Sequence, residues 1–174
     1  MLYVIRHGEV DSNVKWQING WNEEELNETG VKQAINAGKQ LKDIKIDLVI
    51  CSPLLRTKQT YSYLGLDGIE LYYDDRIKER NSNSMVLFPV SKIDRSIWYD
   101  KTKDIVYQDS EGFKSVIERT ESILKEIKEK YKDKNVLLIT HGDICKAIYL
   151  HFNPAVKEID KFHQDNCEII SYEM

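Results

Sequence analysis

Short apolar runs rich in β-branched residues recur along the chain, at residues 2–5, 46–50 and 136–139. Runs of this length with few polar breaks are typical of strands that are covered on both faces. These three segments therefore predict the centre of a sheet. Residues 69–73 and 168–172 have a weaker pattern of the same kind and predict two further strands.

Apolar residues also recur at helical spacing in two longer stretches. One stretch runs from residue 31 to residue 41 and follows Asn27, a residue type that is favoured as a helix N-cap. The other covers residues 113–131 and forms a long apolar stripe. Both stretches predict amphipathic helices that pack on the sheet.

Two more helices are predicted directly after strands. Ser52 offers a capping hydroxyl and Pro53 is a residue favoured at the first helical position, so a helix is expected to start there and to run to residue 64. Asp143 is a candidate cap for a helix over residues 144–150.

The alternation of strands and helices predicts an α/β fold, a three-layer α/β/α sandwich with a largely parallel central sheet. A chain of 174 residues is expected to form a single domain, residues 1–174. Residues 81–107 have no clear periodicity, and we expect them to form an excursion with one short helix that shapes a pocket.

Composition excludes several classes of partner. The chain has 25 Lys and Arg against 29 Asp and Glu, a net charge of -4, so no overall field attracts nucleic acid or an anionic membrane. The first apolar run ends at Arg6 and is too short for a signal peptide or a membrane span. Cys51, Cys145 and Cys167 are odd in number and lie in apolar surroundings, as is typical of buried thiols in a reducing cytosol. We expect a cytoplasmic protein, and its oligomeric state is left open.

Charged and titratable residues collect where the predicted strands end. Arg6 and His7 follow the first strand, Arg56 lies in the first turn of the helix after Ser52, and His141 with Gly142 follows the last central strand. In parallel sheets, ligands bind beyond the carboxyl ends of the strands, where helix N-termini also point. Two guanidinium groups and two imidazoles at one edge predict an anion site, and arginine donors match phosphate oxygens best.

Other residues carry weaker signals. His151 and His163 have no partners at metal-ligand spacing, and the chain contains no Gly-rich nucleotide loop. We therefore expect neither a metal nor a cofactor. Trp16 and Trp21 can line the mouth of a pocket, although core packing or partial exposure is the commoner fate of such rings.

Several blocks occur in a fixed order along the chain: Arg6-His7-Gly8-Glu9-Val10 with Asn13, Gly20-Trp21 with Glu23, Leu26-Asn27 with Gly30, Ser52-Pro53-Leu54-Leu55-Arg56-Thr57-Lys58-Gln59-Thr60, Thr140-His141-Gly142, and Asn166-Cys167. Their order and spacing over nearly the whole chain resemble the histidine phosphatase superfamily, which is also called phosphoglycerate mutase-like. The resemblance implies the fold of that family and a reaction that passes through a phosphohistidine.

The resemblance also implies a role for each matching residue. His7 would be the nucleophile, Glu79 the proton donor, and the phosphoryl oxygens would be bound by Arg6, Asn13, Arg56, His141 and Gly142. The chemistry agrees, because an imidazole with a pKa of about 6.5 is largely neutral at cellular pH and can attack phosphorus. A carboxyl group that faces phosphate and is shielded from water should have a pKa above its usual value of about 4.3.

The chain departs from the family pattern at three places, the first of which is Val10 in place of the usual threonine. Residues 80–86 replace a Gly-Trp-Glu-Gly pattern after the acidic residue, and Asp143 stands where the family often has glycine. A carboxylate close to His141 would raise the pKa of that imidazole. Arg76 and Arg80 flank Glu79 and either bind a second anionic group or form ordinary salt bridges.

Three functions fit these observations. The favoured hypothesis is a histidine acid phosphatase-type phosphomonoester hydrolase that acts on a small phosphorylated metabolite, similar to the short bacterial phosphatases of α-ribazole phosphate or sugar phosphates. A phosphoglycerate mutase is the nearest alternative, although mutases of the family are usually longer and have insertions that enclose the pocket. A non-catalytic phospholigand-binding module is the third, because the segment after Glu79 is altered.

Overall fold

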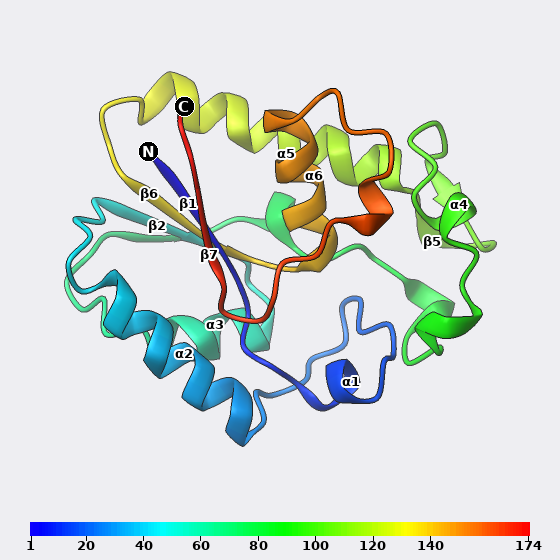
Figure 1. Cartoon of the computed structure of the whole chain (residues 1–174), viewed down its shortest axis with the longest axis horizontal. Coiled ribbons are helices and arrows are strands. Elements are labelled where there is room, and N and C mark those ends of the chain that lie inside the picture. Colours follow the sequence, from blue (N-terminus) through cyan, green and yellow to red (C-terminus); the bar gives the residue numbers. More distant parts are fainter.

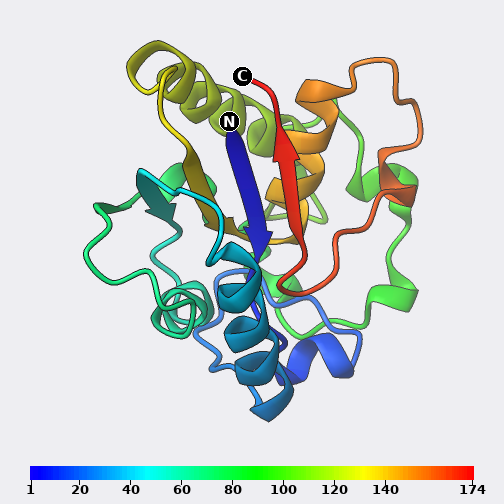
Figure 2. The same cartoon turned by 60° about the vertical axis from the view of Figure 1, so that its left-hand side comes forward.

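The computed structural model describes residues 1–174. Its main sheet has five strands in the order β3-β2-β6-β1-β7. The strands are β1 (Leu2–Arg6), β2 (Leu48–Cys51), β3 (Leu71–Tyr73), β6 (Val136–Thr140) and β7 (Ile169–Tyr172). The first four pair in parallel, and β7 runs antiparallel beside β1 at the edge of the sheet (Figure 2). The predicted, largely parallel sheet is therefore confirmed.

Helices cover both faces of the sheet. Helices α2 (Glu28–Leu41) and α3 (Leu55–Ser62) lie on one face, and α5 (Phe113–Lys130) and α6 (Gly142–Phe152) lie on the other (Figure 1). This arrangement confirms the predicted three-layer α/β/α sandwich. None of the helices combines the length and the apolar character needed to cross a membrane.

The two faces of the central strands supply two separate hydrophobic clusters. In β6, Val136 and Leu138 pack with α5 and α6, whereas Leu137 and Ile139 pack with α2. Successive side chains of a strand point to opposite faces, so a strand covered on both sides is apolar throughout. Each fully buried aliphatic side chain contributes about 1.5–3 kcal/mol. The core therefore holds the ends of β1 and β6, and the residues that follow them, in fixed positions.

Helix starts were predicted with mixed success. Asn27 caps α2 as predicted, because its side chain accepts a hydrogen bond from the Gly30 N–H at 2.8 Å. The predicted start of α3 at Ser52 was wrong. Leu54 is the N-cap and remains extended, which leaves Pro53 outside the helix. The Ser52 hydroxyl contacts a histidine ring instead.

The predicted cap of α6 was also wrong. The helix begins at Gly142 with His141 at the N-cap position, and Asp143 lies inside the first turn. A carboxylate in the first turn still suits the partial positive charge of the helix N-terminus. Asp143 therefore stabilises the helix without capping it.

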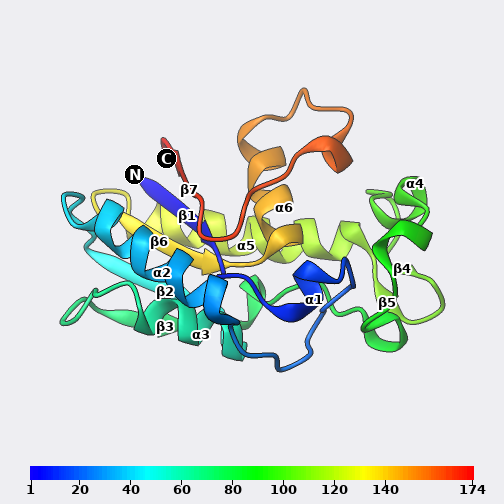
Figure 3. The same cartoon turned by 60° about the horizontal axis from the view of Figure 1, so that its bottom comes forward.

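Shorter elements lie beyond the carboxyl edge of the sheet. Figure 3 shows the parallel strands pointing toward the side that holds α1 (Asp11–Val14) and α4 (Arg95–Trp98), and β7 runs in the opposite direction. The predicted excursion at 81–107 contains the expected short helix, α4. It also contains two short 3-10 helices and the first strand of a hairpin, which were not predicted. The remaining bounds are η1 (Asp75–Ile77), η2 (Asn83–Met85), η3 (Val90–Lys92), β4 (Ile105–Val106), β5 (Ser110–Glu111) and η4 (Ile159–Lys161).

Candidate active site

His7 is held directly beyond the end of β1. Its backbone N–H donates to the Thr140 carbonyl at 2.9 Å, which extends the pairing of β1 with β6 by one residue. The ring Nδ1 lies 2.8 Å from the carbonyl oxygen of Gly8, and the side chain is buried. A carbonyl can only accept, so Nδ1 carries the hydrogen and Nε2 keeps its lone pair. The geometry leaves Nε2 as the nucleophilic nitrogen.

His141 lies beside His7 because β6 is the parallel neighbour of β1. The centroids of the two rings are 5.2 Å apart and the rings are tilted by 55°. His141 Nε2 lies 2.7 Å from Ser52 Oγ, and its buried Nδ1 has no hydrogen-bond partner. An unpaired buried nitrogen is costly, so Nδ1 is an unsatisfied hydrogen-bonding position beside the His7 ring.

Both imidazoles are neutral at physiological pH. Burial lowers the pKa of His7 well below its usual value, and the nearby charge of Arg56 lowers it further. The pKa of His141 is lowered by the same two causes in the same order. The expected raising of the His141 pKa by Asp143 was wrong, because burial and the charge of Arg56 lower this pKa. The Asp143 carboxylate forms a salt bridge with Arg80, with 3.0 Å between Oδ2 and Nε.

Two guanidinium groups, half-buried Arg6 and buried Arg56, lack a carboxylate partner. Arg6 donates to the Gln164 carbonyl at 2.9 Å, and Arg56 donates to the carbonyls of Asn22 and Gly20 at 3.0 and 2.8 Å. The Nε atoms of both arginines are buried without a hydrogen-bond partner. The arginines that form salt bridges are four others, Arg76, Arg80, Arg95 and Arg119.

Arg56 remains charged in this position. Burial lowers the pKa of its guanidinium to about 10, which is still well above neutral pH. Unpaired buried charges are unfavourable by several kcal/mol. A bound anion would remove that penalty for Arg6 and Arg56 together, and a doubly charged phosphate monoester suits two arginines.

Asn13 lies at the wall of the same cavity, close to the backbone of His7. Its Oδ1 accepts from the Val10 N–H at 3.2 Å and from Asn166 Nδ2 at 3.3 Å. Asn166 also donates to the His7 carbonyl at 2.7 Å. Asn166 belongs to the closing block of the sequence pattern, but only the structure links it to the nucleophile.

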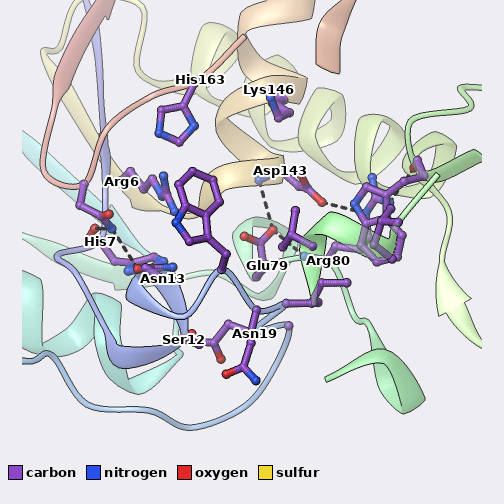
Figure 4. A pocket seen from close by; sticks show the side chains of 18 of the residues that line it. Arg6, His7, Ser12, Asn13, Asn19, Glu79, Arg80, Asp143, Lys146 and His163 are labelled. Atoms are coloured by element: carbon purple, nitrogen blue, oxygen red, sulfur yellow. Dashed lines mark hydrogen bonds and ion pairs between the residues drawn. The ribbon is translucent and has the colours of Figure 1, made fainter. Parts of the chain in front are cut away.

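Glu79 approaches the site from the segment after β3. Its Oε1 accepts from the backbone N–H groups of Arg80 at 2.8 Å and Asp143 at 3.3 Å (Figure 4). A Cβ added at Gly142 would lie 3.7 Å from Glu79 Oε2 and 3.8 Å from Arg6 Nε. Glu79 and Arg6 therefore meet at the first residue of α6.

The environment of Glu79 favours its protonated form. Removal from bulk water raises the pKa of this carboxyl group, and the negative charge of Asp143 raises it further, against the opposing effect of Arg56. This direction agrees with the expectation from the sequence. A carboxylic acid with a raised pKa can donate a proton near neutral pH.

These side chains line one cavity of about 870 Å³. Arg6, His7, Asn13, Arg56 and Glu79 lie at its wall, whereas His141 and Ser52 are fully buried and do not line it. Trp98 and Tyr99 of the 81–107 excursion also line it. Arg76 forms ion pairs with Asp74 and Glu126 away from this cavity. No three His, Cys, Asp or Glu side chains are grouped so that they could hold a metal ion.

Comparison with known proteins decides the family. The family model of the histidine phosphatase superfamily (branch 1) matches residues 2–174. The chain belongs to the histidine phosphatase superfamily. It is 30% identical over 152 residues to an uncharacterized phosphatase, PhoE, of Bacillus subtilis (strain 168), a match that covers 83% of this chain and 73% of that protein.

A second relative and a solved structure are also similar to this chain. A metal-independent phosphoserine phosphatase of Arabidopsis thaliana is 29% identical over 164 residues, covering 88% of this chain and 69% of that protein. The solved structure of Bacillus stearothermophilus YhfR superimposes with a TM-score of 0.85 at 23% identity, covering 98% of this chain and 90% of that one. Relatives of the chain include phosphatases and a phosphoglycerate mutase, and its fold is that of the superfamily.

Proposed function

We propose that the protein hydrolyses the phosphate monoester of a small metabolite through a phosphohistidine intermediate on His7. The observation that carries the proposal is a pair of guanidinium groups, half-buried Arg6 and buried Arg56, which have no carboxylate partner and lie beside two neutral imidazoles. This combination offers a phosphoryl group both a nucleophile and a counter-charge.

In the first step, His7 Nε2 attacks phosphorus and the bond from phosphorus to the substrate oxygen breaks. The Nδ1 hydrogen bond to Gly8 keeps the ring oriented and stabilises the positive charge that develops on it. Glu79 gives its proton to the departing oxygen, so the leaving group departs as an alcohol. Arg6 and Arg56 offset the charge on the phosphoryl oxygens in this step.

In the second step, water attacks the phosphohistidine. Glu79, now a carboxylate, takes a proton from that water, and the bond from phosphorus to Nε2 breaks. Inorganic phosphate leaves, and His7 and Glu79 return to their initial forms. The positive charge in both steps comes from the two arginines and from the N-terminus of α6, so the proposed reaction uses no metal ion.

Phosphate release tests the proposal with wild type and three variants on two monoesters. We expect His7→Ala to abolish release from both 4-nitrophenyl phosphate and an alkyl phosphate. Glu79→Gln should lower kcat on the alkyl phosphate by about 10²–10⁴ and affect 4-nitrophenyl phosphate far less, because nitrophenolate needs no proton to leave. His151→Ala is the matched control, since this exposed histidine lies outside the cavity, and it should resemble wild type.

The same assay separates the alternatives. A protein that binds phosphate but releases none from any monoester would support a binding module and overturn the proposal. Transfer of phosphate between positions of phosphoglycerate, dependent on the bisphosphate, would support a mutase instead.

A further inference from the structure

The cavity extends well beyond the residues that would hold phosphate. At about 870 Å³ it has the size of a site for a drug-sized ligand, and a phosphoryl group fills a small part of that volume. The outer part is formed by the segment around α1, by the excursion at 81–107 and by the segment around η4. These walls contact whatever organic group the phosphate carries.

Every cationic side chain of the outer walls already has a partner. Lys161 pairs with Glu158, and His163 pairs with Asp165. Lys146 donates to three backbone carbonyls, those of Ile159, Asp160 and Phe162, and is nearly buried.

The two arginines of the outer walls form ion pairs, Arg80 with Asp143 and Arg95 with Asp160. These pairs also neutralise both aspartates that line the cavity. Glu9, next to Gly8 in the chain, also lines the cavity; it has no cationic partner, and its Oε1 accepts a hydrogen bond from Asn27 Nδ2 at 3.0 Å. Beyond Glu9, the outer walls offer neither an unpaired cation for a carboxylate nor an unpaired carboxylate for a cation.

Trp16 presents an indole to this outer cavity. It is 72% exposed, more than any other large apolar side chain of the protein. Its backbone φ of 52° lies in the left-handed region, which is strained for a bulky residue. Hydrogen bonds fix the backbone on both sides, from its N–H to the Asn13 carbonyl at 3.1 Å and from the Val90 N–H to its carbonyl at 2.9 Å. The ring is thus held in the cavity wall without being packed in the core.

We infer that the organic group of the substrate is uncharged and carries a flat aromatic ring that stacks on Trp16. The inference rests on the proposed phosphatase function and assigns its substrate class. Trp98, Tyr99 and Phe162 add further aromatic surface to the same cavity, which suits a planar apolar group. The substrate class therefore differs from phosphoserine, the substrate in the name of one relative.

A matched set of monoesters tests the inference. The set is 2-phenylethyl phosphate, ethyl phosphate, phosphoserine and phosphocholine, which all leave as primary alcohols. We expect wild type to prefer 2-phenylethyl phosphate over ethyl phosphate in kcat/KM by about tenfold or more, the size of one stacking contact. Trp16→Ala should abolish most of this preference, Trp16→Phe should keep part of it, and Ile105→Ala, at an exposed site outside the cavity, should keep all of it.

Binding of 2-phenylethylphosphonate and ethylphosphonate, measured by calorimetry, keeps the test independent of turnover. Tighter binding of the aromatic phosphonate that depends on Trp16 supports the subsite even if no monoester is hydrolysed, in which case only the phosphatase proposal fails. Equal binding of the two phosphonates overturns the subsite. A preference for phosphoserine or phosphocholine over 2-phenylethyl phosphate overturns the uncharged class and leaves the phosphatase proposal standing.

Discussion

The ion pair between Arg80 and Asp143 joins two of the places where the sequence departs from its family pattern. Arg80 is 1% exposed, and its Nε lies 3.0 Å from Asp143 Oδ2 (Figure 4). Its guanidinium also lies 4.2 Å from the ring centroid of Trp98, and Nη1 donates to the Trp98 carbonyl at 2.7 Å. The substitution Asp143→Asn removes the only carboxylate that pairs with this buried cation.

The size of the effect follows from the burial of the two partners. Removing one partner of a buried ion pair costs about 3–5 kcal/mol, because the other charge is left uncompensated. The carbonyl of Trp98 still accepts from Arg80, so we expect Asp143→Asn to cost about 3 kcal/mol. We expect Arg80→Met to cost less, about 2 kcal/mol, because the Asp143 side chain is 13% exposed and lies in the first turn of α6.

Urea unfolding at pH 7.5 of wild type, both single variants and the double variant measures the coupling. We expect the double variant to be less destabilised than the sum of the single variants by about 2 kcal/mol. Additivity within 0.5 kcal/mol would refute the reasoning, since residues in direct contact should couple more strongly than that. Lys114→Ala, which removes an exposed cation from its pair with Asp104, is the control and should cost less than about 1 kcal/mol.

Three further predictions follow from the site. Because the fold lowers the pKa values of His7 and His141, the folded protein binds fewer protons than the unfolded chain below pH ~6.5. The free energy of unfolding should therefore be highest above this pH and should fall below it by roughly 1.4 kcal/mol per pH unit for each histidine. Urea titrations at pH 7.5 and 5.5 measure the loss, which should be smaller in His7→Asn; Glu79, with its raised pKa, acts in the opposite direction in both proteins. At Trp16, the glycine variant should be more stable than the alanine variant by about 1 kcal/mol, because only glycine adopts a positive φ without strain; equal melting temperatures would contradict this. Gly30→Ala should lower both Tm and kcat, because a Cβ there would overlap the backbone of the loop after His7; a fully active variant would show that this contact does not position the nucleophile.

The sequence predicted the elements whose local pattern and packing agree. The runs at 2–5 and 136–139 form neighbouring parallel strands. Helices cover both faces of each strand, so each strand is apolar throughout and is easily recognised in the sequence. Asn27 was predicted as a cap because its side chain acts within its own turn. His7 and His141 directly follow two of these central strands. The sequence therefore predicted correctly that the two side chains lie close together.

The errors concern contacts between residues that are distant in the chain. Ser52 is not a cap because its hydroxyl contacts His141, 89 positions later. Asp143 does not raise the pKa of its neighbour and pairs instead with Arg80, a residue of another segment. A local sequence pattern does not predict which distant residue a polar side chain will contact. The position of Trp16 was left undecided for the same reason, because its backbone carbonyl accepts a hydrogen bond from Val90, a residue of a distant segment.

The central claim is that His7 carries the phosphoryl group during turnover. Wild type mixed with 4-nitrophenyl phosphate and quenched within milliseconds in alkaline denaturant should contain one added phosphoryl group, mapped by mass spectrometry to His7. We predict that the adduct survives base, is lost in acid and is missing from His7→Ala. An active wild-type enzyme that shows no such adduct, or that carries it on another residue, would contradict the account.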